Sequence, residues 1–345
     1  MKLDLFDYDL PPELVAQFPA RKRDESRMMV LDRESAGTEI LPFKRIVDYP
    51  QKGDALVVNN TKVFKARLYG HRATGGKVEV FLVRKMDEGP EETWEALIKP
   101  SRRVHPGELI RFSSHSVKMA QHVQGGRWLV QFDSKSQREK VIAKDGHVPL
   151  PQYIKRDDIT SDIRRYQTMF ARKTHEGAVA APTAGFHFTK PVTDKLRARG
   201  VKFIETTLHV GPGTFKPVQT DDIEQHYVDP EFAELKPQAA SRINAVRAKG
   251  GKIYVVGTTS VRTLESAPFE NGEIQPFAGF VDLYIKPGFE FKVTDHLVTN
   301  FHLPKSSLMI LVSAFAGREP ILKAYQKAIE EQFRFYSYGD AMLIL

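Results

Sequence analysis

The sequence predicts an α/β body that is interrupted by a small all-β domain. Its 345 residues exceed the usual size of one domain. Short β-branched segments separated by glycine and proline turns fill residues 62–153, whereas helical and buried-strand patterns alternate on both sides. We therefore expect residues 1–61 and 154–345 to form one α/β body, and residues 62–153 to be an inserted, basic, β-barrel-like domain.

Four segments with alternating apolar residues predict the strands of the insertion. They cover residues 77–83, 94–98, 108–112 and 127–132. The turn signals Thr74-Gly75-Gly76, His105-Pro106-Gly107 and Gln124-Gly125-Gly126 separate them. Short strands at this spacing are typical of a small barrel or sandwich.

Helix and strand signals alternate through the body. Thr189 is a typical helix N-cap, Pro191 suits the first turn and Gly200 follows the end of that helix. A strand is then predicted at residues 201–210. The other predicted elements are helices at 237–249, 306–315 and 319–333 and strands at 252–256, 280–286, 289–293 and 297–299.

Composition excludes several classes of protein. The chain has no cysteine, which excludes a disulfide framework, thiol catalysis and cysteine-based metal sites. No apolar run approaches the roughly 20 residues that a membrane span requires. The N-terminus carries acids where a signal peptide would carry bases. We expect a cytoplasmic protein with no membrane partner.

Positive charge is concentrated in the insertion. Residues 62–153 hold 17 Lys and Arg against 10 Asp and Glu, whereas the rest of the chain holds 34 against 33. A basic segment on a nearly neutral body suits a polyanionic partner such as nucleic acid. The alternative, that the surplus only keeps the domain soluble, is equally open from charge alone.

Three segments share one layout, in which a strand is followed by small or hydroxyl residues and a helix start. They are residues 180–187, 256–262 and 300–307. Ligands of α/β folds bind at the carboxyl ends of strands, where helix N-termini offer free N–H groups. Three such turns that carry His187, His302 and other cationic residues favour an anionic or polar ligand.

Histidines are the candidate proton carriers because an imidazole titrates near neutral pH. Four of them, His187, His209, His226 and His302, lie near predicted strand ends of the body. Each one taken alone is more often structural. None has metal-ligand spacing, so no metal is expected, and the chain has no dinucleotide fingerprint or P-loop.

Two short segments are candidates for contact with nucleic acid. Arg102 and Arg103 suit phosphate contacts at a strand end, although a solvated hairpin explains them equally well. Tyr166, followed by Gln167, offers an aromatic ring for stacking on a base. A helix that buries Tyr166 is the structural alternative.

Taken together, these stretches resemble one family along essentially the whole chain. The matching blocks are GDALVVNNTKVFKARLYG, GGKVEVFLV, LIKPSRR, GHVPLPQYIKR, RYQTMFA, GAVAAPTAGFHFT, TLHVGPGTFKPV, VGTTSVRTLES, TNFHLPKSSLMILVSAFAG and the terminal YSYGDAM. They occur in order, and several exceed ten residues. The sequence resembles the S-adenosylmethionine:tRNA ribosyltransferase-isomerases of queuosine biosynthesis.

The resemblance implies an unusual use of S-adenosylmethionine, which serves as a co-substrate. Its ribosyl group is transferred to, and isomerised on, an aminomethyl-deazaguanine at the wobble position of a tRNA with a GUN anticodon. The products are epoxyqueuosine-tRNA, adenine and methionine. The sulfonium acidifies the ribose C5′ protons, so the protein has to supply a base, an acid, a grip on the methionine carboxylate and a pocket for the loop base. A monomer is expected.

The resemblance also supplies candidate site residues. The proton-transfer candidates are His187, His209 and His302. The candidates for binding S-adenosylmethionine are Thr183, Gly185, Thr258, Thr259, Ser260, Arg262 and Asn300. The candidates for contact with tRNA are Arg102, Arg103, Tyr166, Gln167 and Lys305.

The sequence departs from the family pattern around residues 226–231. The block HYVDPE keeps His226 and Glu231, but Asp229 stands where a second histidine is usual. An aspartate accepts a hydrogen bond but does not normally titrate near neutral pH. Two other readings remain: a tRNA- or RNA-binding protein without catalysis, and an enzyme that uses S-adenosylmethionine on another acceptor.

Overall fold

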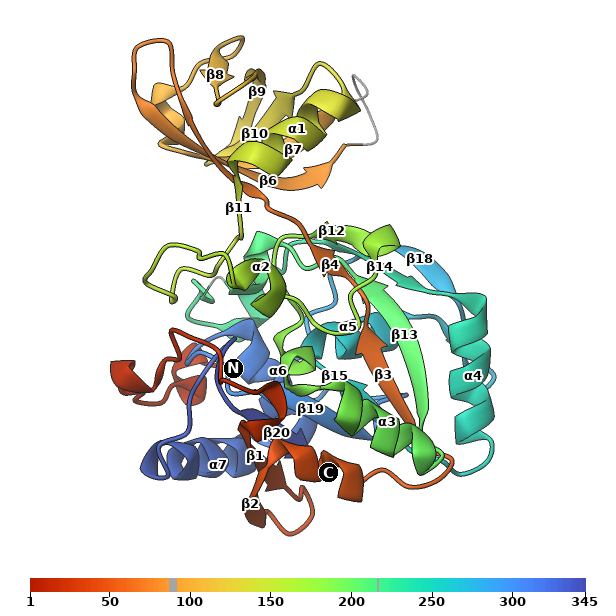
Figure 1. The fold of residues 1–345 in the computed structure, drawn as a ribbon. Helices are drawn as coiled ribbons and strands as arrows, with labels where there is room; N and C mark the ends of the chain where they lie inside the picture. The colour runs from red at the N-terminus through yellow and green to blue at the C-terminus, as the bar shows by residue number, and fades with distance from the viewer. Residues whose placement is uncertain (87–91, 216) are drawn as a thin grey trace.

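The structure, a computed structural model, describes residues 1–86, 92–215 and 217–345. Lys216 of the TLHVGPGTFKPV block lies outside the described residues. Figure 1 shows a small β-barrel at the top of the view, joined to a larger body that contains both chain termini. In the described part of the chain, no helix is long and apolar enough to cross a membrane.

A nine-stranded sheet forms the centre of the body, in the order β18-β14-β13-β3-β15-β19-β20-β1-β2. Its strands are β1 Arg27–Leu31, β2 Thr38–Pro42, β3 Ala55–Asn59, β13 Lys202–Leu208, β14 Glu231–Leu235, β15 Ile253–Val256, β18 Phe277–Val281, β19 His296–Asn300 and β20 Ala341–Ile344. The neighbours β13, β3, β15 and β19 are parallel. Their carboxyl ends therefore lie along one edge of the sheet.

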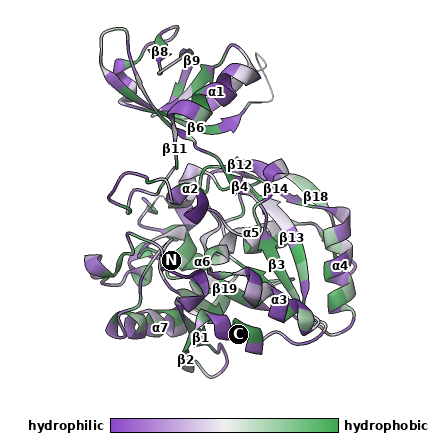
Figure 2. Ribbon diagram, in the orientation of Figure 1, coloured by the Kyte–Doolittle hydropathy of each residue, from purple (hydrophilic) through white to green (hydrophobic). Residues whose placement is uncertain are grey.

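Helices cover both faces of this sheet. They are α3 Lys190–Ala198, α4 Pro237–Arg247, α5 Thr258–Ser266, α6 Ser307–Ala316 and α7 Arg318–Glu330. Every residue of β3 is buried, and Figure 2 shows this strand mainly in the hydrophobic colour. Its side chains alternate: Val57 packs in the cluster that includes α4 to α7, whereas Leu56 and Val58 pack in the cluster that includes α3. A parallel strand covered on both faces needs such an uninterrupted apolar run.

The inserted segment forms a closed antiparallel barrel. Its strands are β5 Arg67–His71, β6 Lys77–Lys85, β7 Thr93–Lys99, β8 Leu109–Arg111, β9 Ser116–Gln124 and β10 Arg127–Gln131. They follow the order β5-β6-β7-β10-β9-β8, and pairing of His71 with Arg111 joins β8 back to β5. Helix α1 (Lys135–Asp145) follows, and β11 (Gly146–His147) pairs with β5. The predicted fold class, an α/β body with an inserted all-β barrel, is confirmed.

The chain crosses between barrel and body at two short strands. These are β4 (Lys62–Val63) and β12 (Glu176–Ala178), which pair in parallel on the body side, next to the barrel. The first barrel strand begins only at Arg67. The limits of 62 and 153 for the insertion remain a prediction.

Two predicted strands differ from the structure. The strand expected at 280–286 lies earlier, as β18, and residues 289–293 are irregular. Phe289 packs edge-on against Phe291 at 5.0 Å, and Phe291 packs against Phe315 of α6 at 4.9 Å. The apolar residues of this segment therefore serve packing against α6. The smaller elements are α2 Asp162–Arg165, the hairpin β16 Phe269–Glu270 and β17 Glu273–Ile274, and the 3-10 helices η5 Ser101–Arg103, η7 Thr183–His187 and η8 Pro212–Phe215.

Candidate active site

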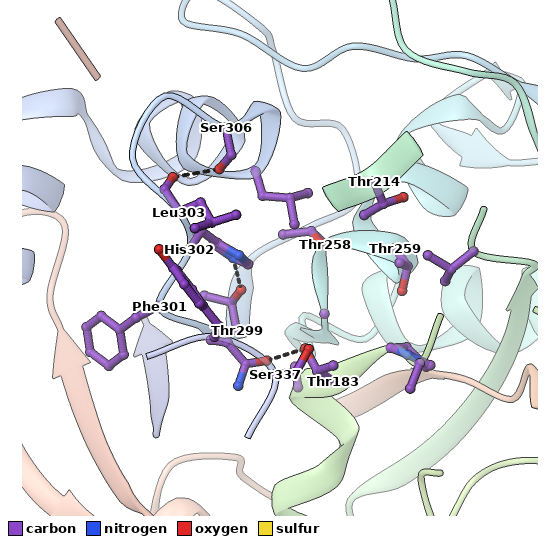
Figure 3. Close-up of a pocket in the computed structure, with 18 of the residues that line it drawn as sticks. Thr183, Thr214, Thr258, Thr259, Thr299, Phe301, His302, Leu303, Ser306 and Ser337 are labelled. Atoms are coloured by element: carbon purple, nitrogen blue, oxygen red, sulfur yellow. Dashed lines mark hydrogen bonds between the residues drawn. The ribbon is translucent and has the colours of Figure 1, made fainter. Parts of the chain in front are cut away.

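The three predicted turns meet around one cavity at the carboxyl edge of the sheet. Residues 181–184 come from the first turn, 257–259 from the second and 300–303 from the third, which Thr299 of β19 precedes. Figure 3 shows Thr183, Thr258 and His302 from these three turns around the cavity. Its other lining residues are Tyr153, Val210, Thr214, Ser306, Leu308, Tyr336 and Ser337. Segments that are 40 or more residues apart in sequence are thereby brought to one site.

Two helices begin at the cavity. Gly257 precedes α5 with φ of +85°, a left-handed conformation that glycine adopts without strain. Thr258 and Thr259, the first residues of α5, line the cavity. Ser306 caps α6 by accepting a hydrogen bond of 3.1 Å from the Met309 N–H. The first N–H groups of a helix have no partner within it, so both helices present partial positive charge to a ligand.

A chain of buried hydrogen bonds starts at the cavity wall. The Thr183 hydroxyl donates to Asn300 Oδ1 at 2.8 Å, and Asn300 Nδ2 lies 3.1 Å from His187 Nε2. His187 Nδ1 lies 2.7 Å from Ser26 Oγ, and the Ser26 hydroxyl donates to the Arg23 carbonyl at 3.1 Å. These donors are satisfied together only when His187 is neutral and carries its proton on Nδ1.

His187 is therefore fixed in one neutral form. Burial, reinforced by the positive charges of Arg334 and Arg23, lowers its pKa to about 3. Both ring nitrogens are engaged, one with Ser26 and one with Asn300. In this arrangement the histidine orients the Asn300 amide, which in turn holds the Thr183 hydroxyl at the cavity.

His302 lies in the cavity wall itself. Its Nε2 is 2.8 Å from Thr299 Oγ1, a contact drawn in Figure 3. Two tyrosines fix the backbone of His302: its N–H donates to Tyr325 Oη at 3.0 Å, and its carbonyl accepts from the Tyr8 hydroxyl. Burial lowers the pKa of His302 to about 3, so the ring is neutral at physiological pH.

His209 does not line the cavity, although its neighbour Val210 does. Its ring stacks on Phe232 at 5.7 Å, and its Nδ1 is 2.8 Å from Thr61 Oγ1. A Cβ atom at Gly177 would lie 2.9 Å from His209 Nε2, so the ring is packed closely against that backbone. Burial, with a smaller effect of His175, lowers its pKa to about 4. Of the three predicted proton-transfer histidines, only His302 lines the cavity.

Three predicted ligand-binding residues do not line the cavity. The Ser260 hydroxyl donates to the carbonyl of Val256, the last residue of β15, at 2.8 Å. Gly185 is buried, and a Cβ there would lie 2.8 Å from Thr168 Cγ2. The Arg262 guanidinium forms a buried ion pair with Glu231 and also donates to the Leu283 carbonyl at 3.1 Å.

The Arg262 and Glu231 pair acts on the site through a neighbouring loop. Glu231 Oε1 accepts hydrogen bonds from the Gly211 N–H at 2.6 Å and from the Thr214 hydroxyl at 2.8 Å. Thr214 lines the cavity. Glu231, one of the two residues kept in the HYVDPE block, thus fixes the loop that forms one wall.

The predicted tRNA contacts are scattered. Arg102 and Arg103 are exposed on η5 of the barrel. Lys305 forms ion pairs with Asp4 at 2.8 Å and Asp7 at 2.9 Å, so its charge is already neutralised.

The two remaining tRNA candidates are engaged inside the body. Tyr166 is 1% exposed and packs edge-on against Phe186 and Tyr338. Neither face of the Tyr166 ring is free to stack on a base. The structure thus matches the alternative in which Tyr166 is buried. The Gln167 amide pairs with the backbone of Val63, donating at 2.6 Å and accepting at 3.2 Å.

A second hollow lies between barrel and body and adjoins the cavity. Its walls include Phe81 and Leu97 of the barrel and Pro151 and Pro212 of the body. Tyr153 lines both this cleft and the cavity, and its hydroxyl lies 2.5 Å from Ser337 Oγ. Sequence reasoning missed both residues as site candidates, although they lie in the quoted blocks GHVPLPQYIKR and YSYGDAM.

Asp229, which stands where the family usually has histidine, connects the two parts of the molecule. Its Oδ2 accepts a hydrogen bond of 2.7 Å from Arg127 of barrel strand β10. Arg127 also pairs with Glu95 of β7. The aspartate therefore forms an ion pair between body and barrel, a role that a neutral histidine would not fill.

No group of three or more metal-ligating side chains occurs among the residues that the structure describes. The expectation that no metal is needed stays a prediction.

Comparison with known proteins gives a consistent result. A family model described as queuosine biosynthesis protein matches residues 3–344. Proteins of Desulforamulus reducens and Aquifex aeolicus, both named S-adenosylmethionine:tRNA ribosyltransferase-isomerase, are each 47% identical, over 348 and 346 residues, with 100% of each chain covered. The crystal structure of S-adenosylmethionine tRNA ribosyltransferase from Thermotoga maritima is 34% identical, with a TM-score of 0.56, over 99% of this chain and 100% of that one. This chain belongs to the queuosine biosynthesis protein family.

Proposed function

We propose that this protein is an S-adenosylmethionine:tRNA ribosyltransferase-isomerase. It transfers and isomerises the ribosyl group of S-adenosylmethionine onto the aminomethyl-deazaguanine at the tRNA wobble position, which gives epoxyqueuosine-tRNA, adenine and methionine. The observation that carries the proposal is the convergence of three small-residue turns on one cavity, in a chain that enzymes of this name match over their full length.

The cavity has the chemistry that S-adenosylmethionine requires. The N-termini of α5 and α6 offer N–H groups for the methionine carboxylate, and Thr183, Thr258 and Thr259 offer hydroxyls. The cavity measures about 50 Å³, far below the roughly 300–1,000 Å³ of typical ligand pockets. Its walls must therefore separate to admit the ligand. The cavity meets the cleft at Tyr153, whose hydroxyl is hydrogen-bonded to Ser337.

We assign the proton transfer to His302 and a positioning role to His187. His302 is neutral and lines the cavity, so it can accept a proton from the ribose carbon next to the sulfonium. His187 has both nitrogens engaged and acts through Asn300. His209 does not line the cavity and takes a structural role.

The cleft between barrel and body is the proposed entrance for the wobble nucleotide. It leads to the cavity past Tyr153, and the exposed Arg102 and Arg103 lie on the barrel, where the positive surplus is concentrated. The proposal includes a GUN-anticodon tRNA as partner, a monomeric enzyme and the cytoplasm as its location.

The test is release of adenine and methionine from S-adenosylmethionine. One reaction contains tRNA with the aminomethyl-deazaguanine at the wobble position, and a parallel reaction contains unmodified tRNA. Equal amounts of adenine and methionine, formed only with the modified tRNA, are expected. Binding of that tRNA without release of either product would instead identify a binding protein, and release with unmodified tRNA would identify another acceptor.

A further inference from the structure

A second pocket in the body carries an unusual concentration of positive charge. It adjoins the cavity, because Ser337 lines both. Arg23, Arg165 and Arg334 line it, together with His187. Among the described residues that line it, none is an aspartate or glutamate.

The hydrogen bonds of Arg23 and Arg165 fix their positions without neutralising their charge. Arg23 donates to the carbonyls of Phe186 at 3.2 Å and Arg164 at 3.1 Å. Arg165 donates to the carbonyls of Arg21 and Ala20, and its Nε is buried without a partner in the described part of the chain.

Of the two nearby carboxylates, Asp162 is engaged outside the pocket, and Asp340 pairs with Arg334. Asp162 forms a double hydrogen bond with Arg156, at 2.7 and 3.0 Å. Asp340 accepts hydrogen bonds from the backbone N–H groups of Arg27 and Arg334, and it is 4.0 Å from the Arg334 Nε. Within the described structure, Arg23 and Arg165 have no carboxylate within ion-pair distance.

The positive charges of the arginines in this pocket repel one another. Burial, followed by repulsion from Arg165, lowers the pKa of Arg23 to about 10, and burial also lowers the pKa of Arg165. An oxyanion bound in the pocket would offset both the burial of these charges and their mutual repulsion. The planar guanidinium matches the oxygens of a phosphate or carboxylate with paired hydrogen bonds.

We propose that the pocket lined by Arg23, Arg165 and Arg334 binds a backbone phosphate of the tRNA, next to the nucleotide that enters the cavity. The inference rests on the proposed function, because it assigns the phosphate to that substrate. The other source of an oxyanion is the carboxylate of S-adenosylmethionine. The helix N-termini of α5 and α6 already provide for that group inside the cavity, so the phosphate is the better match.

The experiment compares Arg165→Gln with Arg164→Gln. Both residues lie on α2 and the charge change is the same, but Arg164 is exposed and does not line the pocket. Binding of the modified tRNA is measured without turnover across a series of salt concentrations. We expect Arg165→Gln to weaken binding by about tenfold and to reduce the salt slope by about one, with Arg164→Gln within twofold of the parent.

Binding of S-adenosylmethionine is measured in parallel by calorimetry. Weaker cofactor binding with unchanged tRNA affinity would assign the pocket to the carboxylate and overturn the proposal. Equal effects of both variants on tRNA would also overturn it, since a general surface charge would then explain binding. If Arg165→Gln does not fold, Arg334→Gln takes its place with the same expected result. Binding of tRNA is measured without turnover, so it tests the phosphate pocket even if no adenine is released. Failure of the proposed function can therefore be distinguished from failure of the proposed pocket.

Discussion

His187 and His302 are both buried and neutral, yet they differ in what their nitrogens can do. His187 sits between Ser26 and Asn300, so accepting a proton would break its contact with the Asn300 amide. His302 faces the cavity and is held there by its backbone. Burial alone does not make a histidine catalytic. The neighbours of the ring decide between proton transfer and positioning.

Replacement of Ser26 by alanine tests the positioning role of His187. Ser26→Ala removes the acceptor of the Nδ1 proton, which lets the other tautomer form and turns the Asn300 amide away from Thr183. We expect kcat to fall by about tenfold and the free energy of unfolding by about 1 kcal/mol. The pH profile of kcat should keep its shape, because no proton carrier is lost.

Ser313→Ala is the matched control for Ser26→Ala. Ser313 is buried in α6, and its hydroxyl has no partner among the described residues. It should leave kcat unchanged. A pH profile whose acidic limb moves in Ser26→Ala would show that His187 itself carries a proton, against the proposed role.

Local turns of the site could be predicted from the sequence, whereas the distant partners of its residues could not. The three turns were predicted from local patterns, and 12 of the 19 described residues that line the cavity belong to them. The partner of His187 could not be predicted, because Ser26 is 161 residues away. Arg262 was predicted to bind S-adenosylmethionine, but the partner of this α5 residue is Glu231 of β14.

At the scale of elements, the start of α5 depends on the backbone of Gly257. A side chain at its φ of +85° is strained, although a Cβ would meet its neighbours only at ordinary contact distance, 3.6 Å. We expect Gly257→Ala to lower the free energy of unfolding by about 1 kcal/mol. The strain shifts Thr258 and Thr259, so KM for S-adenosylmethionine should rise by about tenfold, which initial-rate kinetics can measure.

Gly250→Ala is the control for the turn at Gly257. Gly250 also has a positive φ, of +75°, with nothing within 4 Å of a built Cβ, and it precedes β15 at the opposite end from the cavity. Gly250→Ala should lower the free energy of unfolding by a similar amount and leave KM for S-adenosylmethionine unchanged. An equal rise of KM in both variants would mean that general destabilisation, and not the turn, controls binding.

Elements with a strong local pattern were predicted well, and those that depend on distant partners were not. The predicted helix at 237–249 is α4, and the predicted strand at 252–256 is β15. Strand β9 was missed because only Val117 and Met119 are buried in its nine residues, too few for a visible alternation. The apolar segment 289–293 was wrongly assigned to a strand because its aromatic rings pack on α6, which local sequence does not reveal.

At the scale of the whole molecule, Asp229 changes how the parts are connected. Its ion pair with Arg127 joins a body loop to the barrel, and a Cβ at Gly213 would lie 2.6 Å from its Oδ2. Both side chains of the pair are about 30% exposed, which limits its contribution to stability to at most about 1 kcal/mol. Its main effect is to fix where the barrel sits above the cleft. The family's usual histidine would not form this charge pair at neutral pH.

The buried histidines predict how the stability of the body depends on pH. Burial, aided by two arginines for His187, lowers the pKa of His187 and His302 to about 3, from about 6.5 in the unfolded chain. Below pH 6.5 the unfolded state therefore binds more protons than the folded state, and stability falls as the pH falls towards 3. At pH 5 each histidine should cost about 2 kcal/mol of unfolding free energy relative to pH 7. His209, whose pKa is about 4, acts in the same direction.

Urea denaturation at pH 7 and pH 5 measures this loss. Carboxylates with lowered pKa, such as Asp162, start to lose their contribution only below about pH 4, so this window reports mainly on histidine. His302→Gln should lose about 2 kcal/mol less than the parent between the two pH values, whereas His71→Gln, on the exposed face of the barrel, should match the parent. Equal losses in His302→Gln and the parent would show that His302 titrates alike in the folded and unfolded protein, so that burial does not hold its ring neutral at pH 5.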